Sequence, residues 1–102
     1  MNLLITKRQQ QIEALCRQHY VHRLALFGSA LRDDFDPASS DVDLLIEFGE
    51  MPPQKYFRNY FDLLDAFTQL FGRKVDLVIE RGVKNPYLRR EIESTQQVLY
   101  AA

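Results

Sequence analysis

Three short apolar segments, each long enough for one buried strand, alternate with helix-length amphipathic stretches, and this alternation limits the possible folds more than any other feature of the sequence. The segments are HRLALF at residues 22–27, DVDLLIEF at 41–48 and KVDLVI at 74–79. Polar, glycine or proline clusters separate them, as is typical of strands inside a sheet. The pattern predicts an α/β fold in which helices pack on a small mixed β-sheet. With 102 residues, we expect residues 1–102 to form a single domain.

Amphipathic periodicity predicts three helices between and after these strands. Thr6 and Gln9 have the spacing of a capping box at the start of the first helix. Gly72 follows the long second helix as a C-cap, and Asn85-Pro86 provides the cap and first position of the last helix. The segment 30–40 is too polar for more than a helical turn and a loop. The predicted helices cover residues 6–20, 54–71 and 86–99.

Composition excludes several classes of protein. The 13 Lys and Arg residues nearly balance the 14 Asp and Glu residues, so the chain lacks the basic excess of a domain that binds nucleic acid through its phosphates. The single cysteine, Cys16, allows neither an intrachain disulfide nor a cysteine-rich zinc site. No stretch approaches the ~20 apolar residues of a membrane span, and the first residues do not form a signal peptide. We therefore expect a cytoplasmic protein that binds neither membranes nor nucleic acid directly.

Polar residues at three points would converge if the predicted strands are neighbours in one sheet. Gly28-Ser29 follows the first strand, where free N–H groups and the serine hydroxyl favour an anionic oxygen such as that of a phosphate. Asp41 and Asp43 project from one face of the second strand, a spacing that can hold Mg²⁺ together with substrate phosphates. Asp76 lies inside the otherwise apolar third strand. Three clustered carboxylates repel one another unless cations lie among them, so the three features together predict a metal and phosphate site.

Each of these features also has an ordinary structural interpretation. A glycine followed by a serine after a strand usually marks a plain turn. The Asp41 and Asp43 pair is also compatible with the solvated start of a strand, and Asp76 with an exposed face of the sheet. Their occurrence in this order, on these three elements, favours the site.

The segment FGSALRDDFDPASSDVDLLIEF resembles the signature of the minimal nucleotidyltransferases in the DNA polymerase β superfamily. That signature consists of a strand, a Gly-Ser turn, a loop and a D-x-D pattern on the next strand. KVDLVI resembles the strand that carries the third carboxylate of the family. The resemblance covers the chain from the first helix through NPYLRREI and implies the nucleotidyltransferase, or polymerase β-like, fold. The residues on the motif positions are Gly28, Ser29, Arg32, Ser40, Asp41, Asp43 and Asp76.

The resemblance implies an enzyme that transfers AMP from ATP to a hydroxyl and releases pyrophosphate. It implies that Asp41 and Asp43 bridge two Mg²⁺ ions and that Asp76 completes the ion that activates the acceptor oxygen.

The remaining motif residues are implied to contact the nucleotide. Gly28 and Ser29 would hold the terminal phosphates, with Ser40 also in the nucleotide site. Arg32 would neutralise charge on the transferred group or its acceptor. The alternative for Arg32, pairing with a nearby surface aspartate, stays open.

The predicted helix over residues 54–71 is strongly aromatic, with Tyr56, Phe57, Tyr60, Phe61, Phe67 and Phe71. A helix on a small open sheet buries only one stripe, so we expect part of this apolar surface to contact a partner, unless the aromatics compensate for a small core without Trp. The resemblance implies a specific partner, an all-helical HEPN-domain ribonuclease toxin. This chain would be its antitoxin and would adenylylate a tyrosine near the toxin's active site. Two alternatives remain open: a non-catalytic antitoxin that masks the toxin, and a nucleotidyltransferase that acts on a small molecule.

Overall fold

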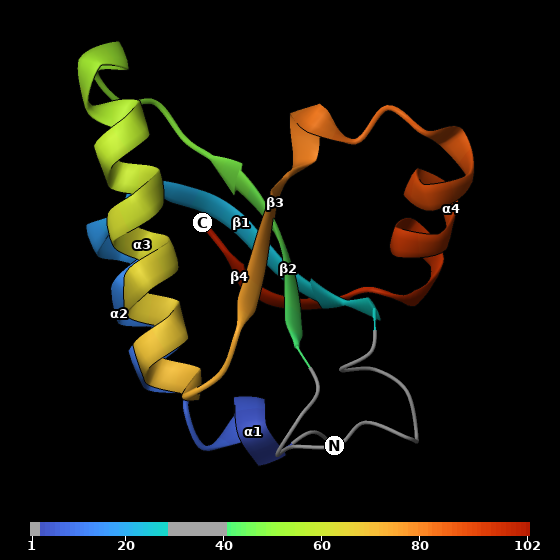
Figure 1. The fold of residues 1–102 in the computed structure, drawn as a ribbon, viewed down its shortest axis with the longest axis horizontal. Coiled ribbons are helices and arrows are strands. Elements are labelled where there is room, and N and C mark those ends of the chain that lie inside the picture. Colours follow the sequence, from blue (N-terminus) through green and yellow to red (C-terminus); the bar gives the residue numbers. More distant parts are fainter. Residues whose placement is uncertain (1–2, 29–40) are drawn as a thin grey trace.

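A four-stranded sheet with the strand order β3-β2-β1-β4 organises the molecule (Figure 1). The computed structural model of the protein describes residues 3–28 and 41–102. β1 (Val21–Phe27) runs antiparallel to both β2 (Val42–Phe48) and β4 (Gln97–Ala101). β3 (Val75–Ile79) is parallel to β2. The sheet is therefore mixed, and the predicted α/β fold class is confirmed.

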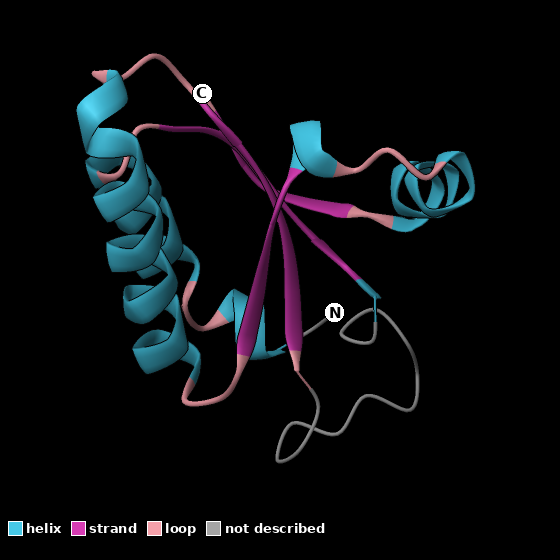
Figure 2. Ribbon diagram, turned by 45° about the horizontal axis from the view of Figure 1, so that its top comes forward, coloured by secondary structure: helices cyan, strands magenta, loops and turns pink. Residues whose placement is uncertain are grey.

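Helices cover the two faces of this sheet unequally (Figure 2). α2 (Gln9–Gln18) and α3 (Tyr56–Phe71) lie side by side on one face, and α4 (Pro86–Thr95) lies on the other. Three short helices complete the described chain: α1 (Leu3–Thr6) and the 3-10 helices η2 (Pro53–Lys55) and η3 (Glu80–Gly82). No helix in the described residues is long and apolar enough to cross a membrane.

The main core lies between the sheet and the α2–α3 layer. Because side chains alternate along β2, Leu44 and Ile46 point into this core and are fully buried, as are Ile12 of α2 and Phe67 of α3. Leu45 points to the opposite face, where it packs against Val83 and Ile92 in a smaller cluster. The face beneath α4 is thus only partly apolar, and this leaves room for polar side chains.

The end of the chain differs from the prediction of a helix over residues 86–99. α4 ends at Thr95, and β4 follows at once as an edge strand. Val98 pairs with Ala25 and Gln97 with Leu26 of β1. The helical spacing of Val98 and Leu99 favours a helix. However, the backbone groups on the free edge of β1 need hydrogen-bond partners, and pairing with β4 provides them, so this long-range pairing overrides the local pattern.

The predicted capping box at the start of the first helix is wrong. Thr6 ends the short α1, and α2 begins at Gln9 without a side-chain cap. The Gln9 amide instead donates a hydrogen bond of 2.8 Å to the backbone carbonyl of Leu99. Gln9 is therefore used to fasten α2 to β4, a contact that its position in the sequence does not indicate.

The other helix ends follow the prediction closely. Gly72 adopts a left-handed conformation with φ 66° at the end of α3. The Asn85 side chain accepts hydrogen bonds from the backbone N–H groups of Tyr87 and Leu88, at 2.9 and 3.3 Å, and so caps α4. The helix predicted from residue 54 begins instead with η2 and becomes α-helical at Tyr56.

Candidate active site

Asp43 and Asp76 lie directly beside each other on the two parallel strands. The register of β2 and β3 pairs Asp43 with Asp76 and Leu44 with Leu77. Neighbouring strands are about 4.8 Å apart, and paired residues of parallel strands point to the same face. The two carboxylates therefore project together from adjacent strands, as the predicted site requires.

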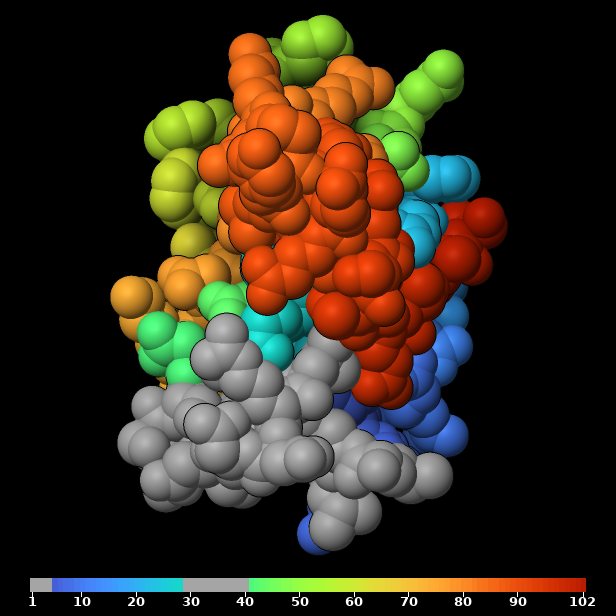
Figure 3. Space-filling view, turned by 90° about the vertical axis from the view of Figure 1, so that its right-hand side faces the viewer, coloured from blue at the N-terminus to red at the C-terminus, as the bar shows by residue number. Residues whose placement is uncertain are grey.

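The pair occupies the sheet face that α2 and α3 leave uncovered. Asp43 lies between the buried Val42 and Leu44, and Asp76 between the buried Val75 and Leu77, whose side chains enter the main core. Strand alternation turns both carboxylates the other way, where they are half-buried. Figure 3 faces this side of the molecule and shows the end of β1 in cyan and the start of β2 in green, next to α4 in orange and red.

Asp41 lies one residue before β2 and contacts a basic residue. Its carboxylate is 3.9 Å from the ammonium group of Lys74, and both side chains are substantially exposed. The backbone N–H of Val42 also donates to the carbonyl of Lys74, at 3.0 Å, so the two strand starts are joined. Lys74 was not among the predicted site residues, although its position as the first residue of KVDLVI places it beside the D-x-D pattern once the strands are paired.

Gly28 fits against the Asp43 carboxylate at the end of β1. It has φ +73°, and a Cβ atom at this position would overlap the carboxylate of Asp43. Only glycine satisfies both conditions without displacing a neighbour. The turn glycine and the carboxylate pair thus belong to one local arrangement, whereas the predicted site residues Ser29, Arg32 and Ser40 lie outside the described residues.

The donor set suits a hard divalent cation such as Mg²⁺. Mg²⁺ is usually bound through one or two carboxylates, with water and substrate phosphates as the other ligands. Asp43 and Asp76 offer such a pair, and Asp41 follows at the same end of the strands. Within residues 3–28 and 41–102, no group of three or more His, Cys, Asp and Glu side chains comes close enough to hold an ion by itself. The side-by-side carboxylates of Asp43 and Asp76 fit an ion whose other ligands are water and substrate phosphates.

Tyr60 of α3 supports the strand that carries Asp76. Its hydroxyl donates a short hydrogen bond to the backbone carbonyl of Leu77. Burial raises the pKa of Tyr60 above its usual value, and the nearby Tyr56 and Asp76 raise it further. The hydroxyl consequently stays protonated and remains a donor to β3. The local sequence pattern does not indicate this contact, because Tyr60 and Leu77 are 17 positions apart and meet only in the folded chain.

Three further titratable side chains, those of Cys16, His19 and His22, make contacts that belong to the fold and not to the carboxylate pair. Cys16 is fully buried, and burial is the main reason that its pKa is raised to about 12. The Nδ1 atom of His19 lies 2.8 Å from the carbonyl oxygen of Leu15, and His22 lies 3.8 Å from Glu47. Cys16 and His19 belong to α2 and its C-cap, and His22 lies at the opposite end of β1 from Phe27, which pairs with Asp43.

Comparison with known proteins agrees with this geometry. A family model described as "Nucleotidyltransferase domain" matches residues 8–99. "Putative protein adenylyltransferase MJ0128" of Methanocaldococcus jannaschii is 40% identical over 79 residues, which are 78% of this chain and 76% of that protein. The solved "Structure of putative minimal nucleotidyltransferase" is 31% identical, with a TM-score of 0.69, and the match covers 91% of this chain and 90% of that chain.

A more distant solved structure shares the fold. It is a tri-AMPylated Shewanella oneidensis HEPN toxin in complex with an MNT antitoxin, with a TM-score of 0.64 at 17% identity over 95% of this chain and 72% of that chain. The family match extends across both carboxylate strands and all the described helices except α1. This chain therefore belongs to the nucleotidyltransferase domain family, as a minimal nucleotidyltransferase related to protein adenylyltransferases.

Proposed function

We propose that this protein transfers AMP from ATP to a tyrosine hydroxyl of an HEPN-domain ribonuclease toxin in the cytoplasm and thereby acts as its antitoxin. The observation that carries the proposal is the pairing of Asp43 with Asp76 beside Gly28. Two further facts support it: relatives of this chain are named protein adenylyltransferases, and a protein of the same fold was solved in complex with an AMPylated HEPN toxin.

The reaction would exchange one phosphorus–oxygen bond for another. The acceptor oxygen attacks the α-phosphorus of ATP, and the bond from that phosphorus to the bridging oxygen of the pyrophosphate breaks. Asp76 would accept the proton of the hydroxyl, and pyrophosphate leaves with the bonding electrons. Asp41, Asp43 and Asp76 would hold two Mg²⁺ ions, which would stabilise the negative charge on the phosphates.

The neighbouring residues would position the triphosphate. Gly28 brings the backbone close to Asp43, and we assign the terminal phosphates to Gly28 and Ser29, with Ser40 beside them. Arg32 would neutralise charge on the group being transferred. Lys74, which already contacts Asp41, would offset the charge of that one carboxylate before the ions bind and so reduce the repulsion among the three acidic side chains.

A test of the proposal compares catalysis with simple masking of the toxin. An HEPN-domain protein from the same organism is assayed for RNA cleavage after incubation with ATP, Mg²⁺ and either the wild-type protein or the Asp41→Ala, Asp43→Ala double variant. We expect the wild type to suppress cleavage after it has been removed from the toxin, because the AMP group remains on the toxin. The double variant should not do so.

The contrary outcome is equally clear. If the double variant suppresses cleavage as well as the wild type, and suppression ends when the antitoxin is removed, the protein is a masking antitoxin and not an adenylyltransferase. Mass spectrometry of the toxin then shows no AMP adduct.

A further inference from the structure

One side of α3 exposes a row of aromatic side chains that the fold does not use. Phe57 is 75% exposed and Phe61 49% exposed, and Tyr56 is exposed beside them at the start of the helix. Farther along the same helix, Phe67 and Phe71 enter the core. The exposed rings therefore lie on the first two turns of α3, and we call Tyr56, Phe57 and Phe61 the aromatic ridge.

The ridge is held in place by ring contacts. Phe57 and Phe61 have ring centroids 4.8 Å apart, and Phe61 meets the half-buried Tyr60 at 5.1 Å with the rings nearly perpendicular. Tyr56 makes an edge contact of 5.4 Å with Phe48 of β2. Side chains that are already ordered lose little entropy when another molecule covers them, which favours binding.

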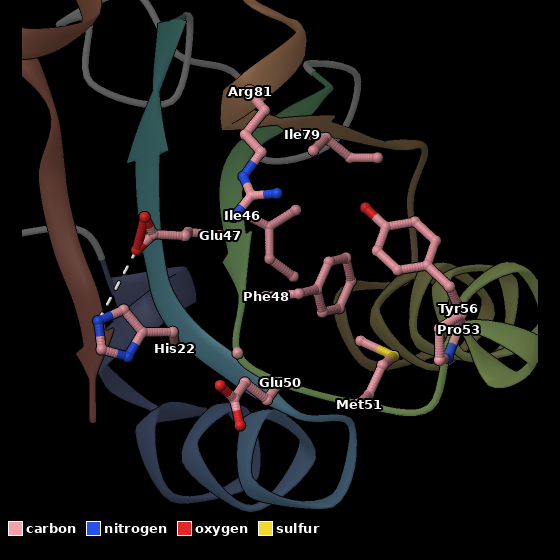
Figure 4. A pocket seen from close by; sticks show the side chains of 11 residues that line it. His22, Ile46, Glu47, Phe48, Glu50, Met51, Pro53, Tyr56, Ile79 and Arg81 are labelled. Atoms are coloured by element: carbon pink, nitrogen blue, oxygen red, sulfur yellow. Dashed lines mark ion pairs between the residues drawn. The ribbon is translucent and has the colours of Figure 1, made fainter.

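A cavity of about 750 Å³ adjoins the ridge. Figure 4 shows Tyr56 on one wall of this cavity, with Phe48 and Ile46 on its floor and Arg81 reaching over it from the side of η3. Tyr56 therefore belongs to both the cavity and the ridge. The two form one continuous surface, an apolar hollow next to projecting rings.

Charged groups at the rim define what can enter this cavity. Arg81 is exposed and forms no hydrogen bond or ion pair with the rest of the described chain. Glu47 contacts His22 at 3.8 Å, and Glu50 lies on the far side of the rim from Arg81. An entering group with an apolar side chain and a neighbouring carboxylate would fill the hollow and pair with Arg81.

The cavity beside the aromatic ridge and the carboxylate pair lie at opposite ends of β2. Asp43 is at the beginning of this strand and Phe48 is its last residue. Phe48 lies five positions after Asp43 along the strand, or roughly 16 Å away. A molecule that covers the ridge and the cavity would therefore leave the carboxylates open to nucleotide.

We propose that the aromatic ridge and the adjoining cavity form the surface that binds the protein substrate, through an apolar anchor residue flanked by an acidic one. This inference rests on the proposed function for the identity of the substrate, the HEPN-domain protein. The new element is the place where the substrate protein is held. It lies away from the reacting groups, and its contacts persist whether or not AMP is transferred. Binding and transfer are therefore separable.

The test measures binding without ATP, so that no transfer can occur. Biolayer interferometry gives the Kd between this protein and the purified HEPN-domain protein proposed as its substrate, for the wild type, Phe57→Ser with Phe61→Ser, and Arg81→Glu. Tyr87→Ser is the matched control, because Tyr87 is 80% exposed on α4, across the sheet from the ridge. We expect Kd to rise about tenfold or more for both ridge and Arg81 variants and to stay within about twofold for the control. Thermal melts verify that all variants are folded.

A second measurement separates the two proposals. In AMP transfer assays the ridge variant should show a raised KM for the protein substrate with an unchanged KM for ATP. If the wild type binds its partner but transfers no AMP, the docking surface stands and the proposed function fails. Unchanged Kd in the ridge variant, or no binding by the wild type, overturns the docking surface. A wild-type dimer that the ridge substitutions dissociate, seen by light scattering, also overturns it, because the occupant is then a second copy of this chain.

Discussion

Gly28 and Asp43 constrain each other at the centre of the candidate active site. The glycine has a positive φ, and the carboxylate occupies the space where any other residue would place its Cβ. The backbone therefore approaches the carboxylate more closely than another residue type would allow. The glycine of the motif is thus explained by contact as well as by turn geometry.

Replacing Gly28 separates these two effects. Gly28→Ala should destabilise the fold by about 1–2 kcal/mol through its left-handed backbone, and should reduce AMP transfer on the order of a hundredfold by displacing Asp43. Gly72→Ala is the control, since Gly72 has φ +66° but no atom within 4 Å of the position of an added Cβ. Urea denaturation should show comparable losses of stability for the two variants. Equal activity in both would contradict the role given to the contact with Asp43.

The raised pKa of Cys16 predicts how the free energy of unfolding depends on pH. Burial, and then the charge of Glu13, raise the pKa of its thiol from 9.0 to about 12, with Arg17 acting in the opposite direction. The folded thiol remains protonated where the unfolded one ionises, so its stabilising contribution is complete below pH 9 and is lost as the pH rises toward 12.

The measurement is a comparison of unfolding free energies at pH 8 and pH 10 for the wild type and Cys16→Ala. The wild type should lose about 1 kcal/mol more than the variant over this interval, because titration of all other groups is shared by both proteins. Equal losses would show that the thiol ionises equally in the folded and unfolded states. A thiol reagent at pH 8 should modify Cys16 only after unfolding.

At the scale of elements, β4 completes the sheet on the side away from the carboxylates. Leu99 is buried in the main core, and its carbonyl accepts a hydrogen bond from Gln9 of α2. β4 thereby holds α2 against the sheet. This strand, which the sequence pattern did not predict, ties the first helix to the end of the chain.

Substitutions in β4 should reveal its alternating faces. Leu99→Ala removes a side chain that is 5% exposed and should lower the free energy of unfolding by about 2–4 kcal/mol. Val98→Ala, at a position that is 48% exposed, should cost less than about 1 kcal/mol. Equal losses of stability in the two variants would contradict the placement of Leu99 in the core and Val98 on the exposed face. Chemical denaturation of the two variants measures both losses.

The elements that local patterns define were predicted, and those that depend on distant partners were not. Three strands follow from apolar runs with clear boundaries. The end of α3 follows from Gly72 and the start of α4 from Asn85, because both residues act on the backbone within a few positions. β4 and the α2 start depend on contacts across the sheet. In the candidate site, residue types and spacing singled out the acidic residues, and the register of β2 and β3 places two of them, Asp43 and Asp76, side by side. Lys74 and Tyr60 act through strand pairing and packing, which the local sequence does not express.

At the scale of the whole molecule, the carboxylate pair and the proposed docking surface lie at different ends of the sheet, and the core and the carboxylates lie on opposite faces of it. α2 and α3 cover one face and supply most of the core, while the opposite face carries Asp43 and Asp76 at the start of the parallel strands. The aromatic ridge and its cavity lie at the other end of β2. A chain of 102 residues can in this way hold a protein substrate and still leave its reacting groups accessible.

The central claim is that the acidic residues on β2 and β3 transfer AMP, and the most direct measurement follows the label of ATP into the partner protein. ATP labelled at the α-phosphate is incubated with Mg²⁺ and the HEPN-domain protein, together with the wild type, Asp43→Asn, Asp76→Asn or the control Glu13→Gln. Glu13 lies on α2, where its carboxylate accepts a hydrogen bond of 3.3 Å from the Gln9 amide, and belongs neither to the carboxylate pair nor to the aromatic ridge. We expect label on the partner with the wild type and Glu13→Gln, and a loss of at least about a hundredfold with the other two. Undiminished labelling by folded Asp43→Asn and Asp76→Asn would contradict the account.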